Sequence, residues 1–156
     1  IVCPKKHDQD RTSYDVQLAE KGMEYTPDWI ILAGWMRVLS NAFLTKFHWK
    51  VINIHPALPG AFPGTHAIER AYESYQQGKI EHTGVMIHLV PDEGVDNGPV
   101  LAQEIVEINK EDTLESLEEG IHRVEYRLYI ETIGKILSDV SWIERIRNAY
   151  STSLHT

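Results

Sequence analysis

The sequence predicts an α/β protein in which a mostly parallel sheet of buried strands is flanked by helices. Short continuous apolar runs alternate with stretches of helical periodicity, which is typical of this class. Runs of this length that are rich in Ile and Val are typical of buried parallel strands. The composition is 42% hydrophobic and 24% charged over 156 residues, as in ordinary globular chains. We therefore expect residues 1–156 to form a single domain.

The first half of the chain alternates between helical and strand patterns. In chain order these are a helix over residues 13–24, a strand over 29–33, a helix over 36–47 and a strand over 51–54. Residues 55–64 follow with three prolines and two glycines. We expect this segment to be a loop, because proline removes a backbone donor and glycine permits unusual backbone angles.

The second half continues the alternation. In chain order we expect a helix over 66–77, a strand over 83–90, a loop over 91–99, a strand over 100–108 and a short terminal helix over 142–150. A long helix with the clearest periodicity precedes the terminal one, and Asp112 or Thr113 can cap it. Its apolar residues recur at steps of three and four: Leu114, Leu117, Ile121, Val124 and Leu128.

Polar segments follow the expected strands in the first part of the chain. Residues 34–37 follow the first strand, Asn53 and His55 finish the second, and the 92–97 loop follows the third. In open α/β sheets, ligands bind beyond the carboxyl ends of the strands. We therefore expect these segments to converge on one edge of the sheet and to form the site there.

Asn53, His55 and Asp96 are the residues at this edge that can carry chemistry. An asparagine amide can donate to a developing oxyanion, and a histidine exchanges protons near neutral pH. An aspartate can orient the histidine, hold a water or accept a proton. Each residue also has an ordinary structural interpretation, since His55 precedes a proline in a loop and Asp96-Asn97-Gly98 is a common turn sequence.

Composition and charge exclude several classes of function. The net charge of −8 is unfavourable for general nucleic-acid binding. No apolar run approaches the roughly 18 residues of a membrane helix, and no secretory signal is visible. The single cysteine, Cys3, fits a reducing, cytoplasmic location. No spacing of His, Cys or Glu matches a metal-ligand motif such as H-E-x-x-H, so we expect no metal.

Residues 53–66, NIHPALPGAFPGTH, resemble a signature of the folate-dependent formyltransferases. The segments AGWMRVL at 33–39, GVMIH at 84–88 and DEGVDNGP at 92–99 resemble the same family in the same order. The resemblance runs from about Arg11 to Leu137 and implies a Rossmann-like fold. It is closest to members that act in purine synthesis. It therefore implies transfer of a formyl group from the co-substrate 10-formyltetrahydrofolate to the amine of glycinamide ribonucleotide.

The resemblance also implies roles for individual residues. Asn53, His55 and Asp96 match the catalytic trio: Asn53 and protonated His55 would stabilise the oxyanion, and pairing with Asp96 would raise the pKa of His55. The implied folate-binding residues are Arg11, Met36, Arg37, Val38, Leu39, Asn53, Asp92, Glu93, Gly94, Val95 and Asp96. The implied residues that bind or position the ribonucleotide are His66, His88, His122 and Glu125.

One departure from the family affects the expected activity. Members begin with a strand and a Ser-Gly-rich loop that leads into a helix and binds the substrate phosphate. No part of this sequence matches that unit, so we expect it to be lacking and residues 1–156 alone to transfer formyl groups weakly. The resemblance implies small-molecule substrates as partners. It leaves a homodimer possible, and we expect binding to neither nucleic acid nor membrane.

Three other interpretations share these motifs. A formyltetrahydrofolate deformylase would give the formyl group to water, and the His122 and Glu125 pair favours the ribonucleotide enzyme instead. A methionyl-tRNA formyltransferase would carry a basic RNA-binding domain, which residues 100–156 do not provide. A non-catalytic folate-binding domain would not need Asn53, His55 and Asp96 together.

Overall fold

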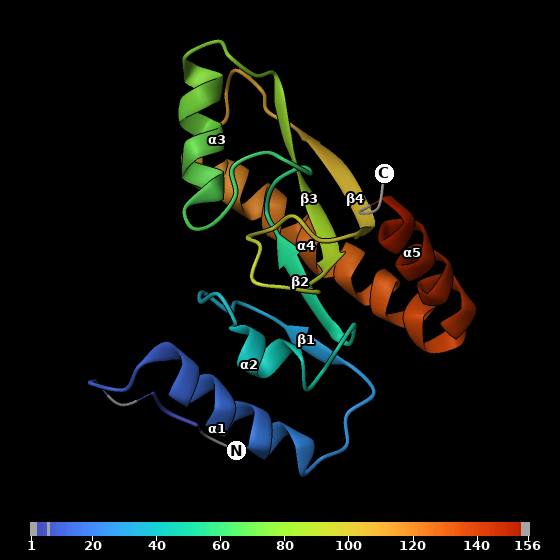
Figure 1. Ribbon diagram of the computed structural model, residues 1–156. Helices are drawn as coiled ribbons and strands as arrows, with labels where there is room; N and C mark the ends of the chain where they lie inside the picture. Colours follow the sequence, from blue (N-terminus) through green and yellow to red (C-terminus); the bar gives the residue numbers. More distant parts are fainter. Residues whose placement is uncertain (1–2, 6, 154–156) are drawn as a thin grey trace.

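The computed structural model describes residues 3–5 and 7–153, and over this part of the chain helices surround a four-stranded sheet (Figure 1). The elements in chain order are α1 (Arg11–Met23), β1 (Ile30–Leu32), α2 (Asn41–Leu44), β2 (Val51–His55), α3 (Ala67–Gln76), β3 (His82–Leu89), β4 (Val100–Glu107), α4 (Leu114–Ser138) and α5 (Val140–Ser153). The alternation of helices and strands predicted from the sequence is confirmed.

The direction of the strands corrects the expectation of a mostly parallel sheet. The strand order is β1-β2-β3-β4, and only β1 and β2 run parallel among the described strands. β2 with β3 and β3 with β4 are antiparallel. The error arises because β3 is buried on both faces and so lacks the alternation of apolar and polar residues that marks many antiparallel strands. α4 contacts β3, and Leu58 of the loop between β2 and α3 lies directly against Gly84 in β3.

The helix predicted over 36–47 is wrong for most of its length. Only α2 forms there, and residues 34–40 are irregular. Gly34 has a φ of +64°, and the buried carboxylate of Asp15 accepts a hydrogen bond from the Ser40 backbone amide at 2.6 Å. The apolar residues that suggested a helix, such as Leu39 and Phe47, are buried all the same. They pack between α1, α2 and β2 in a core of their own.

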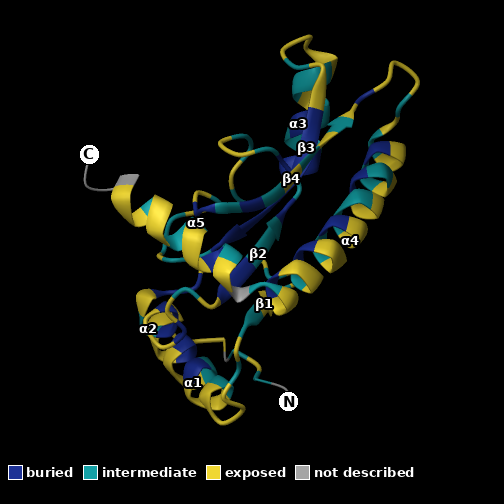
Figure 2. Cartoon of the chain, turned by 90° about the vertical axis from the view of Figure 1, so that its right-hand side faces the viewer, coloured by how far each residue is buried: buried dark blue, intermediate teal, exposed yellow. Residues whose placement is uncertain are grey.

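α1, α3 and α4 begin close to the residues that the sequence indicated. Asp10 caps α1 by accepting from the Ser13 amide at 2.9 Å. Thr113 caps α4, and Ser116 completes a reciprocal capping box with it. α4 runs along one side of the sheet, with its buried stripe turned inward (Figure 2). The long-helix prediction is therefore confirmed.

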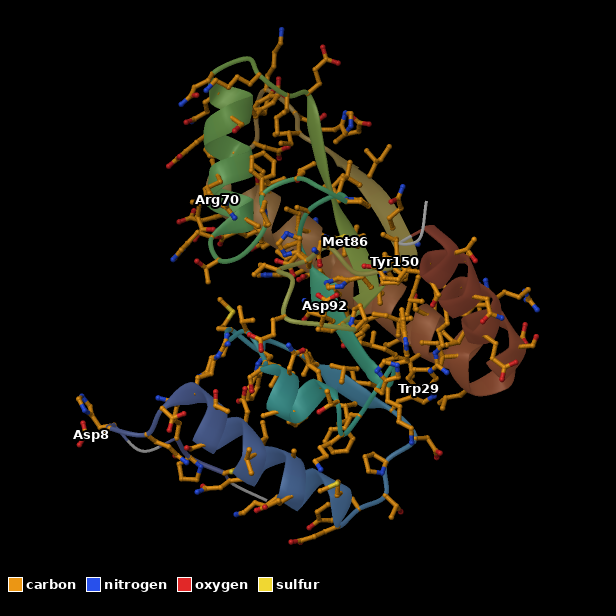
Figure 3. All side chains as sticks on the ribbon, viewed as in Figure 1. Asp8, Trp29, Arg70, Met86, Asp92 and Tyr150 are labelled. Atoms are coloured by element: carbon orange, nitrogen blue, oxygen red, sulfur yellow. The ribbon has the colours of Figure 1, made fainter. Side chains whose placement is uncertain are left out.

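The terminal helix α5 is longer than the predicted 142–150 and packs near the beginning of the parallel strands. Ile143 is fully buried in the main core. Arg147 donates to the carbonyl of Trp49 at 2.6 Å, and its guanidinium lies 5.3 Å from the ring centre of Trp29. Trp29 lies just before β1, and Tyr150 lies on α5 (Figure 3).

Within the described residues, no helix is both long enough and apolar enough to span a bilayer.

Candidate active site

A cavity of about 530 Å³ lies where the ends of β1 and β2 meet the loops and one face of α4. Its wall includes the irregular 34–39 segment, the beginning of α3 and part of the loop between β3 and β4. This volume lies within the roughly 300–1,000 Å³ range of ordinary small-molecule sites. Most of the residues singled out from the sequence line this cavity, so it is the candidate active site.

Asn53, His55 and Asp96 meet at this cavity. Asn53 and His55 lie two residues apart on β2, so their side chains leave the same face of the strand. Asn53 Nδ2 donates to Asp96 Oδ1 at 3.2 Å, and His55 Nδ1 lies 3.3 Å from Asp96 Oδ2. The convergence predicted from the sequence is confirmed, although the predicted reason for it is wrong.

The loop between β3 and β4 brings Asp96 to the site by folding back over the sheet (Figure 1). β3 is antiparallel to β2, so its last residue, Leu89, pairs with Ile52 near the beginning of β2. The carboxyl end of β3 therefore lies away from that of β2. The loop returns to β2 because the Asp96 carboxylate accepts from the Gly64 amide at 2.8 Å as well as from Asn53.

Asp96 is held by an unusual number of partners. His88 Nε2 lies 3.4 Å from Asp96 Oδ1, and Asp96 itself has a φ of +51°. Burial raises the pKa of the Asp96 carboxyl, but the contact with His88, the hydrogen bond from the Gly64 amide and the nearby His55 lower it more. The net pKa lies below its ordinary value, so Asp96 is a carboxylate at neutral pH.

Both ring nitrogens of His55 face acceptors. Nδ1 faces Asp96, and Nε2 lies 3.1 Å from the carbonyl oxygen of Phe62. The side chain is only 4% exposed. Burial lowers the pKa of the imidazole, and the Asp96 charge and the loop carbonyls oppose this effect only in part. The expected upward contribution of Asp96 is present, but the net pKa of His55 lies below its ordinary value.

His88 and His66 occupy different environments at the cavity wall. His88 is buried, pairs in register with Asn53, and its Nδ1 donates to the Leu89 carbonyl at 2.8 Å. That bond fixes its tautomer in the neutral state and leaves Nε2 facing Asn53 and Asp96. His66 is largely exposed, and its Nδ1 lies 2.8 Å from Glu69 Oε1.

The 36–39 segment lines the cavity as the sequence indicated. Met36 is 69% exposed, whereas Leu39 is buried. Arg37 stacks against two aromatic rings, with its guanidinium 5.3 Å from the ring centre of Tyr14 and 5.8 Å from that of Trp35. Cation–π contacts of this kind hold a guanidinium in place while its charge stays available to a ligand.

Two of the implied folate residues lie outside the cavity wall. Arg11 Nη2 donates to Glu93 Oε2 at 2.5 Å, and Glu93 Oε1 accepts from the Asn41 amide at 2.8 Å. Glu93 thus ties the loop that carries Asp96 to α1 and α2. The rest of the loop, including Asp92, Gly94 and Val95, contributes to the cavity wall.

One face of α4 closes the cavity. His122 and Glu125 lie there as expected, with 3.8 Å between Nε2 and Oε2. Burial raises the pKa of Glu125, and His122 opposes this effect. Tyr126 and Tyr129 line the same wall and were missed. Their spacing from His122, at four and seven residues, is the helical signal that could have found them.

Arg70 on α3 was also missed, because it contacts backbone carbonyls that no sequence motif marks. Its guanidinium donates to Phe62 and Pro63 carbonyls, both at 2.7 Å, and to the His66 carbonyl at 3.3 Å. For metal binding, the described part of the chain contains no group of three or more His, Cys, Asp or Glu side chains that could hold an ion.

Comparisons with known proteins identify the family to which this chain is similar. A family model described as formyl transferase matches residues 1–133. The chain is 47% identical over 133 residues to phosphoribosylglycinamide formyltransferase of Schizosaccharomyces pombe, covering 83% of this chain and 63% of that protein. It is 46% identical over 134 residues to the enzyme of the same name from Dictyostelium discoideum, covering 82% and 64%. The chain thus spans less than two thirds of the length of these relatives.

A solved structure shares the fold. The crystal structure of phosphoribosylglycinamide formyltransferase from Bacillus halodurans superposes with a TM-score of 0.77 at 43% sequence identity. The match covers 84% of this chain and 65% of the other. The mixed sheet and flanking helices described above are therefore those of the matched proteins.

Proposed function

This chain belongs to the formyl transferase family, and on that basis we propose that it transfers a formyl group from 10-formyltetrahydrofolate to the amine of glycinamide ribonucleotide. The observation that carries the proposal is the convergence of Asn53, His55 and Asp96 on one cavity. An amide donor, an imidazole and an ionised carboxylate within hydrogen-bond reach are the groups that acyl transfer to an amine requires.

The chemical step gives each of the three groups a role. The amine nitrogen bonds to the formyl carbon while the electron pair of the C=O bond moves to oxygen. Asn53 Nδ2 donates a hydrogen bond to that oxyanion, and the charge of protonated His55, held between Asp96 and the Phe62 carbonyl, stabilises it further. The C=O bond then re-forms, and the bond from the formyl carbon to N10 of the folate breaks. Asp96 accepts the proton that the amine loses and returns it, through water, to N10.

The two substrates would approach this trio from different sides. The 36–39 segment and the 92–96 loop offer backbone groups and apolar side chains to the flat pterin ring of the folate. His122 and Glu125 on α4 offer polar groups to the ribose of the ribonucleotide. This division leaves the amine and the formyl carbon in contact at His55, which makes the attack effectively unimolecular.

The proposal is tested by incubating the chain with both substrates and identifying the products by mass spectrometry. We expect the formylated ribonucleotide and tetrahydrofolate to appear in equal amounts. Folate binding, measured by calorimetry without the ribonucleotide, is an independent check. A control reaction without ribonucleotide separates the alternatives: free formate there indicates a deformylase, and folate binding without either product indicates a binding domain.

We also propose that residues 1–156 alone hold the substrate phosphate weakly and that the family's phosphate-binding strand–loop–helix is not among them. Two observations support this proposal. Arg37 is the only lysine or arginine among the described residues that line the cavity. β1 is three residues long and pairs with β2 alone among the described strands, so its other edge is free for a further strand.

Weak phosphate recognition predicts poor discrimination between substrates with and without a phosphate. For residues 1–156, kcat/KM with glycinamide ribonucleotide is expected to exceed that with the dephosphorylated riboside by no more than about threefold. If these residues make no charge-assisted contact with the phosphate, removing the phosphate costs little, whereas losing such a contact would reduce kcat/KM far more. Steady-state kinetics with both substrates measures the ratio. A preference of about a hundredfold or more would place a phosphate site within these residues.

A further inference from the structure

The loop between β2 and α3 is fixed from two sides at the cavity. From the sheet side, Asp96 accepts from the Gly64 amide at 2.8 Å. From the helix side, Arg70 donates to the carbonyls of Phe62 and Pro63, both at 2.7 Å. Figure 3 shows Arg70 on the part of α3 that faces this loop. The loop needs such tethers, because Phe62 and His66 both have positive φ values, +47° and +57°.

The Phe62 carbonyl is shared between two side chains. Arg70 Nη2 donates to it, and His55 Nε2 lies 3.1 Å from the same oxygen. The oxygen is therefore the link between a half-buried guanidinium on α3 and the buried imidazole on β2. A longer route runs through the Pro63–Gly64 peptide, because Arg70 donates to its carbonyl and its amide donates to Asp96, which faces His55 Nδ1.

We propose that Arg70 is a positioning residue for His55: it holds the Phe62 carbonyl against Nε2 and so sets the direction of the imidazole. This inference rests on the proposed function only for its effect on turnover. Its structural content, that Arg70 controls the environment of His55, stands whichever reaction the site performs. Arg70 does not line the cavity, so it acts through the loop rather than on the substrate.

The charges around His55 give the direction of the expected effect. Asp96 lies on one side of the ring, His88 lies behind Asp96, and the Arg70 cation lies beyond the Phe62 carbonyl. Burial lowers the pKa of His55, whereas Asp96 and the carbonyls of the 61–62 segment raise it. If the carbonyl leaves Nε2 while the positive charge at position 70 is kept, the pKa of His55 falls further.

The variant Arg70→Lys makes this change. Lysine keeps the charge but lacks the planar fork that donates to two carbonyls at once. We expect the His55 pKa, followed by NMR of ring-labelled histidine, to fall by about half a unit or more, the size of a lost hydrogen bond to the charged form. His55→Gln identifies the resonance. Arg145→Lys, on exposed α5 and remote from the cavity, is the matched control and is expected to change nothing.

Steady-state kinetics provides a second measurement, because a residue with a purely structural role would not change kcat and KM in different proportions. For Arg70→Lys we expect kcat to fall about tenfold while KM for the folate changes less than about threefold, because the affected group acts in the chemical step. An unchanged His55 titration in a folded Arg70→Lys chain overturns the proposal, as does a rise in the His55 pKa.

The titration requires no substrate, so it separates this inference from the proposed function. A shifted His55 pKa in a chain that transfers no formyl group supports the role of Arg70 and contradicts the proposed reaction. If Arg70→Lys fails to fold, Arg70→Gln replaces it, because one shorter amide cannot hold the Phe62 and Pro63 carbonyls as the guanidinium does. Loss of the positive charge alone would raise the pKa of His55, so a fall in that pKa supports the proposal and an unchanged or raised pKa overturns it.

Discussion

Replacing Asp96 with asparagine is expected to reduce formyl transfer by about 10²- to 10⁴-fold, mainly in kcat, which is the range for removing a positioned acid–base group. The substitution keeps the shape of the side chain but removes its charge and its ability to accept a proton. Asparagine also tolerates the positive φ of +51° at this position, so the backbone is not strained by the change. Steady-state kinetics against both substrates measures the loss.

The asparagine also disturbs the hydrogen bonds around it. Asp96 accepts from the Gly64 amide and from Asn53 Nδ2 through its two oxygens. An asparagine has one acceptor oxygen, so its own NH₂ would face one of these donors. We expect a loss of about 1–3 kcal/mol in the free energy of unfolding, the cost of leaving a buried polar group without a partner. Asp8→Asn, at a fully exposed carboxylate, is the control and is expected to leave activity and stability unchanged.

The pH dependence of the free energy of unfolding separates the contribution of the Asp96 charge from that of the disturbed hydrogen bonds. The pKa of Asp96 is lowered in the folded chain, so the folded state binds the proton more weakly than the unfolded state. The stabilisation is therefore fully present above the ordinary aspartate value of about 3.9 and is lost as the pH falls through the folded pKa. In Asp96→Asn this part of the acid dependence disappears. An Asp96→Asn chain with wild-type kcat would remove Asp96 from the mechanism.

The site was predictable from the sequence where its residues lie close together in the chain. Asn53 and His55 are two residues apart on a strand, and this spacing alone places them on one face. His122 and Glu125 share a helix face for the corresponding reason. Asp96 was identified through the loop motif, but its contact with β2 depends on a loop that folds back across an antiparallel pair. Local periodicity carries no information about that return.

The other errors have the same origin in long-range contacts. The helix predicted over 36–47 does not form over 34–40, because Asp15 on α1 takes the Ser40 amide that an intact helix would use. Arg11 was assigned to the folate, yet in this structure its charge is paired with Glu93, which lies 82 residues further along the chain. Arg70 carries no motif at all, since its partners are carbonyl oxygens. Such contacts are set by how the elements pack, which one sequence does not reveal.

Replacing Gly98 with alanine is expected to lower the free energy of unfolding by about 2–4 kcal/mol and to reduce activity as well. Gly98 is buried at the end of the loop that carries Asp96. A Cβ atom there would overlap the carbonyl oxygen of Leu89, which belongs to the backbone and cannot rotate away. The Leu89 amide donates to the Pro99 carbonyl at 2.9 Å and closes the same loop. Urea unfolding measures the loss of stability.

Gly134→Ala provides the matched control, because it adds the same methyl group where there is room. Gly134 lies inside α4, and beyond its chain neighbours and the helix's own backbone no atom lies within 4 Å of the position that its Cβ would take. Alanine is favoured over glycine in a helix interior by about 1 kcal/mol, so this variant is expected to be slightly more stable than the wild type. Changes of opposite sign in the free energy of unfolding would assign the Gly98 effect to the overlap with Leu89 rather than to alanine itself.

A Gly98→Ala chain as stable as the wild type would contradict this close packing. If the variant folds but kcat per folded molecule falls, the displaced loop no longer holds Asp96 against Asn53 and His55.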